Sequence, residues 1–139
     1  METIYESKYQ RVLYNPELSI FEEIWLPESE YMNDDIYKQE FRDILKAAQP
    51  YRGKTDKIFI DAVNAMYVVS PELQEWHNQN VFAKLIEMGV TRFAVLLSKD
   101  LFTQVSYEQT FEEAEDAGFL IEYFDDREQA RQWLLEQHA

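Results

Sequence analysis

The stretch Lys57-Ile58-Phe59-Ile60-Asp61-Ala62, followed by the break Ser70-Pro71-Glu72-Leu73, decides the fold. Its apolar residues run without alternation, which is typical of a strand that helices bury on both faces of a parallel sheet. Phe93-Ala94-Val95-Leu96-Leu97 repeats the pattern, so we expect two central parallel strands. Asp61 then lies at the carboxyl end of a strand, the edge at which open α/β sheets bind ligands and partners.

Helix start and stop signals surround these strands. Asn33 and the acidic pair Asp34-Asp35 open a helix that ends near Gly53. A second helix begins at Ser70, whose hydroxyl can cap it, and stops at Gly89. The first of these helices carries apolar residues at helical spacing: Tyr37, Phe41, Ile44, Leu45 and Ala48.

Similar signals return in the last third of the chain. Ser106-Tyr107-Glu108-Gln109 has the form of a capping box and predicts a helix start, and Gly118 ends that helix. Phe119-Leu120-Ile121 begins the next strand. Asp125 or Asp126 caps a last helix. Its inward stripe is Ala130, Trp133 and Leu134.

The N-terminal third reads as a β-hairpin. A strand around 10–14 is followed by the turn residues Asn15-Pro16 and by a second extended segment. That segment carries apolar side chains on one face: Leu18, Ile20, Ile24 and Leu26. No linker or repeat divides the chain. We therefore predict one α/β domain over residues 1–139, a sandwich with a mixed sheet and an N-terminal β-hairpin, in the order ββαβαβαβα.

Composition narrows the class of protein. The chain has 139 residues, no cysteine and a formal net charge of −14, so disulfides, thiolate catalysis and sulfur-ligated zinc are excluded. The acidic balance repels nucleic acid and anionic lipid unless a basic patch overrides it, and the thirteen lysines and arginines look scattered. No apolar segment approaches the ~20 residues of a membrane helix. We expect a soluble, cytoplasmic protein with no nucleic-acid partner and no membrane insertion.

No group of residues predicts an enzyme. His77 falls on an apolar row at four-residue steps with Leu73, Val81 and Leu85, which favours a partly buried core histidine over a general base. His138 is one residue from the end of the sequence, and nothing brings it to His77 for metal binding. Dipole complementarity and solubility explain the acidic pairs Asp34-Asp35, Glu112-Glu113 and Asp125-Asp126. We predict no catalytic residue, no metal and no cofactor.

The order of elements resembles the STAS-like group of proteins. The resemblance rests on Ile58-Phe59-Ile60-Asp61, Ser70-Pro71-Glu72-Leu73-Gln74-Glu75-Trp76 and Gly89-Val90-Thr91-Arg92-Phe93-Ala94-Val95. More narrowly, the chain is similar to the SpoIIAA-like proteins, bacterial relatives of anti-sigma-factor antagonists that are also grouped with CRAL-TRIO lipid-binding domains. The resemblance spans most of the chain without a catalytic signature. It implies a bacterial, non-enzymatic interaction module.

Partner-switching members of that family carry Asp-Ser-Ser-Gly after the corresponding strand, and a kinase phosphorylates a serine there. Here Asp61 matches, but Ala62, Val63 and Asn64 follow. Because none of these three has a hydroxyl, we expect the phosphorylatable serine of the family to be absent. Ser70 is a substitute in principle, since phosphate is favoured at a helix N-terminus, but capping fully accounts for a serine before proline.

Six residues near the end of the first central strand form the predicted binding crevice: Asp61, Asn64, Tyr67, Ser70, Trp76 and His77. Asp61 either accepts hydrogen bonds from loop amides, which is the favoured reading, or faces a ligand. Met66-Tyr67-Val68-Val69 is an apolar loop that another part of the chain or a second subunit must cover.

Two functions are favoured over an enzyme. The first is a protein-interaction or regulatory module of STAS-like type, which docks an unidentified protein or a second copy through the crevice. The alternative is binding of a small apolar or lipid-like ligand in an aromatic-lined cavity, since 15% of the residues are aromatic. A closed apolar cavity would favour that alternative, and a filled interior would count against it. The apolar loop and an exposed edge hairpin also predict a homodimer.

Overall fold

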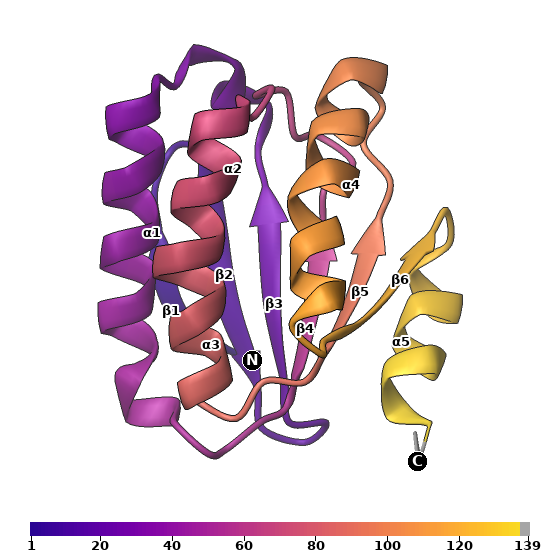
Figure 1. The fold of residues 1–139 in the computed structure, drawn as a ribbon. Helices are drawn as coiled ribbons and strands as arrows, with labels where there is room; N and C mark the ends of the chain where they lie inside the picture. Colours follow the sequence, from indigo (N-terminus) through magenta and orange to yellow (C-terminus); the bar gives the residue numbers. More distant parts are fainter. Residues whose placement is uncertain (137–139) are drawn as a thin grey trace.

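The computed structural model describes residues 1–136, which fold around a six-stranded mixed sheet (Figure 1). The strands lie side by side in chain order: β1 Glu2–Glu6, β2 Gln10–Asn15, β3 Ile20–Trp25, β4 Lys57–Asp61, β5 Arg92–Leu96 and β6 Leu120–Phe124. Strands β1 to β3 pair antiparallel, and β3 to β6 pair parallel. The loops that follow β3, β4, β5 and β6 therefore share one edge of the sheet.

Helices connect the parallel strands: α1 Asp34–Ala48, α2 Pro71–His77, α3 Ala83–Glu87, α4 Leu101–Asp116 and α5 Arg127–Leu135. Two short 3-10 turns, η1 Pro27–Tyr31 and η2 Gln49–Tyr51, flank α1, and a π-helical turn, η3 Asn78–Phe82, joins α2 to α3. Helices α1, α2–α3 and α4 stand in front of the sheet in Figure 1. Helix α5 packs on the opposite face.

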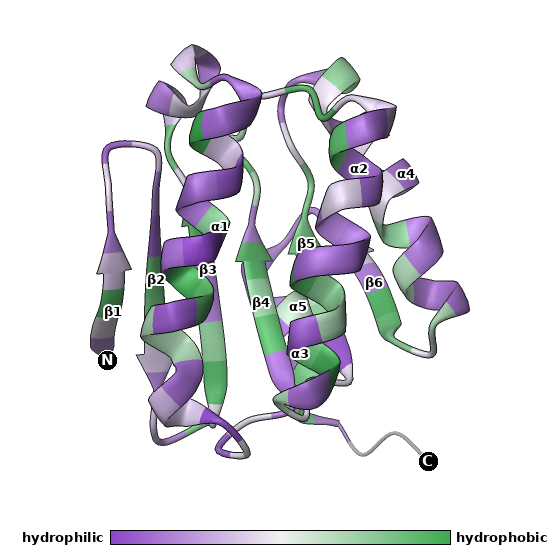
Figure 2. Cartoon of the chain, turned by 60° about the vertical axis from the view of Figure 1, so that its left-hand side comes forward, coloured by the Kyte–Doolittle hydropathy of each residue, from purple (hydrophilic) through white to green (hydrophobic). Residues whose placement is uncertain are grey.

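The strands alternate between two cores. On the side of α1 to α4 the side chains include Phe21, Trp25, Ile58, Ile60 and Phe93. On the side of α5 a smaller core is formed by Ile20, Phe59, Ala94, Leu96, Ala130 and Leu134. Both faces of the central strands are therefore buried, as the unbroken apolar runs predict, and in Figure 2 these strands are hydrophobic while the helices turn hydrophilic residues outward.

Local capping signals place most helix starts correctly. The side chain of Asn33 accepts a hydrogen bond from the Ile36 N–H, and that of Ser70 accepts one from Leu73. Asp126, one of the two predicted caps, starts α5. Gly118 follows α4 with a φ of 104°, a left-handed conformation that glycine adopts without strain. The α/β class and the mixed sheet are confirmed.

The predicted order ββαβαβαβα is wrong at the N-terminus, where the structure has three strands. Strand β1 pairs with β2 and covers it, so the predicted hairpin of β2 and β3 is not an edge. Strand β3 also pairs parallel with β4 and is buried on both faces, with Phe21 on one side and Ile20 on the other. Short strands with few apolar residues, such as β1, form by pairing rather than by burial, which their sequence does not reveal.

The predicted start of α4 at Ser106 is also wrong. The helix begins at Leu101, and the Asp100 side chain caps it by accepting a hydrogen bond from the Thr103 N–H at 2.9 Å. Ser106 is instead buried inside the helix, where its hydroxyl donates to the Thr103 carbonyl and accepts from the Val69 N–H at 3.0 Å. A serine that bonds a neighbouring loop has the same sequence pattern as a cap.

Candidate functional site

Asp61 is the last residue of β4 and contacts α5, and Asn64 lies in the loop that follows. One Asp61 carboxylate oxygen accepts a hydrogen bond from the Val63 N–H at 3.2 Å, and the other pairs with the Arg127 guanidinium at 2.6 Å. The Asn64 side chain bonds the Lys99 ammonium at 3.3 Å. Both Asp61 oxygens are thus engaged, which is the structural role favoured from the sequence, extended by an ion pair to α5.

The same arginine joins Asp61 to a second buried carboxylate. Arg127 lies 3.7 Å from Glu22, and Arg131 pairs with Glu22 at 3.2 Å. The Arg127 guanidinium also lies over the Phe59 ring, with its central carbon 4.7 Å from the ring centre. Two arginines of α5 therefore balance two carboxylates of the central strands, and this cluster holds the helix on the sheet.

Tyr67 and Ser70 lie on the loop between β4 and α2, at the carboxyl edge. The Tyr67 hydroxyl donates to Asp34 in the first turn of α1. The Ser70 hydroxyl accepts the Leu73 N–H at 3.2 Å and so serves as a helix cap. Both hydroxyls therefore have a structural partner within the chain.

Trp76 and His77 are neighbours in the sequence but point in different directions. Trp76 is half-buried and lines a surface groove between α1 and α2–α3. His77 is buried in the main core, where its Nδ1 lies 2.8 Å from the Tyr37 hydroxyl. Burial lowers the pKa of His77 to about 3, so the imidazole is neutral and is a poor base. Tyr67, Trp76 and His77 all pack against the Tyr37 ring, with ring centres 5.8–6.4 Å from it. Asp61, Asn64 and Ser70 have other partners, so the six predicted residues do not form one crevice.

A half-buried carboxyl that faces the core is the first feature that the sequence analysis missed. Glu23 of β3 faces the main core beside a cavity of about 50 Å³. Burial raises the pKa of Glu23 to about 7, while a hydrogen bond with the Trp25 side chain opposes the rise. The Tyr107 hydroxyl, which also borders the cavity, has no hydrogen-bond partner among residues 1–136. Glu23 follows Phe21 by two residues in a strand, so both side chains lie on the same face of the sheet. This spacing is the sequence signal that could have predicted that Glu23 faces the core.

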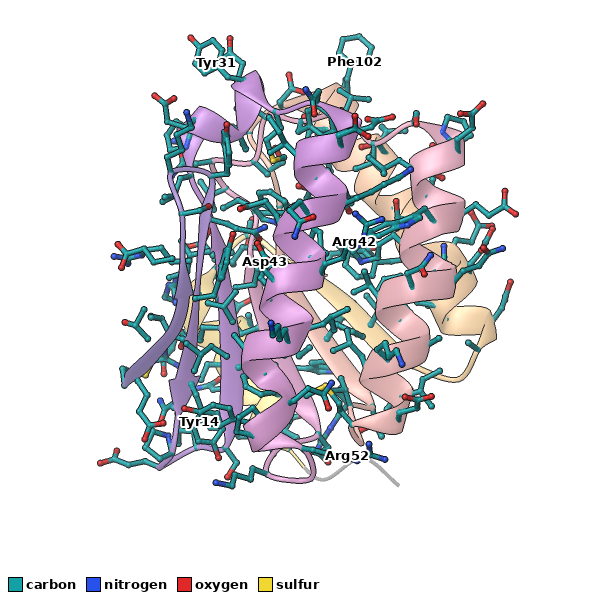
Figure 3. All side chains as sticks on the ribbon, turned by 90° about the vertical axis from the view of Figure 1, so that its left-hand side faces the viewer. Tyr14, Tyr31, Arg42, Asp43, Arg52 and Phe102 are labelled. Atoms are coloured by element: carbon teal, nitrogen blue, oxygen red, sulfur yellow. The ribbon has the colours of Figure 1, made fainter. Side chains whose placement is uncertain are left out.

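The second feature is an exposed apolar surface, of which the sequence analysis identified only the loop 66–69. Of the eleven large hydrophobic side chains that are exposed in residues 1–136, seven lie in or just after the loops that follow β3, β4 and β5. We name this surface the apolar rim: Tyr31, Met66, Val68, Leu97, Leu101, Phe102 and Val105. Phe102 is 74% exposed and Tyr31 69%, and Figure 3 shows both projecting from the same end of the molecule.

The loop 66–69 is held rigidly within this rim. The Met66 N–H donates to the buried Ser29 hydroxyl at 3.0 Å, and the Val69 N–H donates to Ser106 at the same distance. Val69 itself is buried, whereas Met66 and Val68 stay exposed. Part of the apolar loop is thus covered by its own chain, as one of the two sequence alternatives required, and the rest faces outward.

Comparisons of the chain with protein-family models, with curated proteins and with solved structures give no match. Within residues 1–136, no three His, Cys, Asp or Glu side chains gather as metal ligands would. The same part of the chain contains no helix with the length and apolar character needed to cross a membrane. His138 lies outside the described residues.

Proposed function

We propose that the chain is a non-enzymatic protein-interaction module of STAS-like type that docks a partner protein through the apolar rim. The observation that carries this proposal is the gathering of exposed apolar side chains at one edge of the sheet. Patches of this kind mark interaction sites, because exposing them to water is unfavourable unless a partner covers them. The hydrogen bonds that fix the loop 66–69 reduce the entropy lost on docking.

Charge around the rim indicates the chemistry of the partner. The loops 26–33, 62–70 and 97–100 contain one cation, Lys99, against several carboxylates. Glu28, Glu30, Asp34, Asp35 and Glu72 are all exposed at this edge. A partner that presents an apolar patch bordered by lysines and arginines fits both features. A second copy of the chain fits less well, since two acidic rims repel each other.

The proposal does not include phosphorylation. Ala62, Val63 and Asn64 leave no hydroxyl after β4. The Ser70 hydroxyl already accepts a backbone hydrogen bond at the start of α2. Regulation of docking would therefore act through the abundance of the partner or through ionic strength, both of which change occupancy without covalent modification.

The sequence-based alternative, an apolar or lipid-like ligand, has less support. The interior cavity of about 50 Å³ is aromatic-lined, but it is small. A cavity of about 150 Å³ is the size that binds benzene, so a larger ligand would have to displace core side chains. Glu23 in its wall would also lose hydration on contact with an apolar ligand.

The test compares two variants in capture from lysate of cells that express the chain naturally. The double variant Leu101→Ser, Phe102→Ser removes two of the most exposed rim side chains. Ile86→Ser, an exposed apolar position on α3 away from the rim, is the matched control. We expect a specific protein to be retained by the unmodified chain and by the control, and lost with the double variant.

A purified pair then gives the affinity. Hot-spot truncations of this type cost about 2 kcal/mol or more, which weakens binding about thirtyfold. Binding should also weaken as sodium chloride rises, because the proposed partner is basic. A partner that the double variant still binds with unchanged affinity would refute the rim as the docking surface.

A further inference from the structure

A groove of about 260 Å³ runs along the surface between α1 and α2–α3, on the outer side of the helices. One bank is α1 and its end, and the other is the continuous helix from α2 to α3. The groove is lined by Arg42, Leu45, Lys46, Gln49, Trp76, Asn80 and Lys84. It shares no residue with the apolar rim.

Cations gather at this groove in a chain of net charge −14. Lys38, Arg42 and Lys46 follow one another at four-residue steps and so lie on one face of α1. Lys84 adds a cation from the opposite bank. The expectation from the sequence that lysines and arginines are scattered is therefore wrong here. Four of the thirteen lie together, since folding places α3 beside α1.

Carboxylates of the described chain neutralise few of these charges. Neither Arg42 nor Lys46 has a carboxylate at ion-pair distance among residues 1–136, and Lys84 reaches only the exposed Glu87, at 3.7 Å. Figure 3 shows Arg42 on the side of α1 toward α2, while Asp43 points to the other side. Helix-dipole complementarity accounts for Lys46 and Lys84, which lie in last turns, but not for Arg42 in the middle of α1.

The groove also has an aromatic wall and amide groups. The Arg42 guanidinium lies 5.6 Å from the Trp76 ring centre, and the Lys38 ammonium 5.9 Å from it, so two cations flank one indole. Leu45 extends the apolar surface, and Gln49 and Asn80 supply amides from the two banks. A flat apolar group has a surface to lie on, next to cations and neutral hydrogen-bond donors.

We propose that this groove binds a small organic phosphate monoester that carries a flat apolar group. A phosphate dianion matches several neighbouring cations better than a carboxylate does, and a guanidinium can donate two parallel hydrogen bonds to it. The volume of about 260 Å³ suits a small molecule. Leu45 and Trp76 contact the apolar group, while Arg42, Lys46 and Lys84 contact the phosphate.

The test is an NMR titration of the labelled protein with phenyl phosphate as the probe. We expect saturable shifts of the Trp76 indole signal, which a Trp76→Phe variant assigns, and of amides on α1 and α3. Inorganic phosphate and phenol should each bind at least about tenfold more weakly, because each has only one of the two groups. Arg42→Gln and Lys84→Gln should each weaken binding of phenyl phosphate by about tenfold.

Lys8→Gln is the matched control, since Lys8 is also an exposed cation beside a ring, 5.3 Å from the centre of Tyr9, but lies on the β1–β2 turn. It should leave the dissociation constant within about twofold. Three results would overturn the proposal: no saturation at the groove, equal binding of phenol, or equal weakening by Lys8→Gln. The spectrum of each variant reports its folding, so loss of binding and loss of structure are distinguished.

Discussion

Glu23 shows how one side chain can couple the fold to pH. Its carboxyl lies between the sheet and an aromatic shell, where Tyr37 and Tyr107 are also buried. Burial favours the neutral form, which is why the folded-state pKa of about 7 exceeds the ordinary value of 4.5. Between these two values the folded protein holds a proton that the unfolded chain has released. Stability must therefore fall as pH rises through this window.

We predict that Glu23→Gln removes the fall in stability that occurs as the pH rises through this window. At pH 5, near the lower end of this window, the free energies of unfolding of the variant and the unmodified protein should differ by less than about 1 kcal/mol, since most of the loss develops at higher pH. At pH 8 the variant should be more stable by about 1–3 kcal/mol, because one pKa unit corresponds to about 1.4 kcal/mol and the carboxyl is only partly buried. Urea unfolding followed by circular dichroism at the two pH values measures the difference.

The titration of His77 changes stability with pH in the opposite direction, and it does so equally in the variant and the unmodified protein. Its pKa of about 3 in the fold lies below the ordinary 6.5, so it raises stability with pH between these values in both proteins. Glu28→Gln, at an exposed position, serves as the control. An equal stabilisation by Glu23→Gln at pH 5 and pH 8 would show that the carboxyl is not titrating between them.

At the scale of elements, α5 is the one helix that covers the second face of the sheet in residues 1–136. It has only two fully buried side chains, Ala130 and Leu134, both at 0% exposure. The ion pairs of Arg127 and Arg131 with Asp61 and Glu22 surround this small contact. A helix with so few apolar contacts depends on each of them.

Leu134→Ala should therefore lower the free energy of unfolding by about 2–5 kcal/mol, the range for removing a fully buried leucine side chain. Leu135→Ala is the matched control in the next position of α5, where the side chain is 45% exposed. It should change stability by less than about 0.5 kcal/mol. Thermal or urea unfolding of the three proteins measures the free energies of unfolding. Similar decreases for both variants would contradict the packing of α5.

At the scale of the whole molecule, charge and apolar surface are distributed unevenly. The acidic carboxyl edge carries the apolar rim, and four cations gather on the helical face between α1 and α3. Neither feature follows from the net charge of −14 alone. The two proposed sites share no residue, so we expect that occupation of one leaves the other open.

The homodimer expected from the sequence remains a prediction, to which the structure adds a salt dependence. Pairing of two rims brings like charges together, so we expect a dimer through this surface only when salt screens them. Light scattering at 50 and 500 mM sodium chloride over a range of protein concentrations measures this. A dimer that is strongest at low salt would place the contact elsewhere, for instance along the edge strand β1.

Much of the fold could be read locally. An unbroken apolar run such as Ile58-Phe59-Ile60 marks a buried strand, and Asn33, Ser70 and Asp126 mark helix starts, since a cap bonds an N–H two or three residues away. Where a residue forms its hydrogen bond with a distant segment instead, the local pattern predicts a helix start at the wrong position. Ser106 of α4 is the example, because its hydroxyl accepts a hydrogen bond from the Val69 N–H in a separate loop.

The sequence by itself determined which segments become buried strands and amphipathic helices, because the apolar spacing and the caps that specify them act within a few residues. Only the tertiary structure decided which side chains meet. Arg127 pairs with Asp61, which is 66 positions away in the sequence. Lys84 and Arg42 line the same groove from different helices. Trp76 lines that groove, whereas its sequence neighbour His77 is buried beside Tyr37. The physical reason is that helix packing and strand order set these distances, and spacing along the chain carries no record of them.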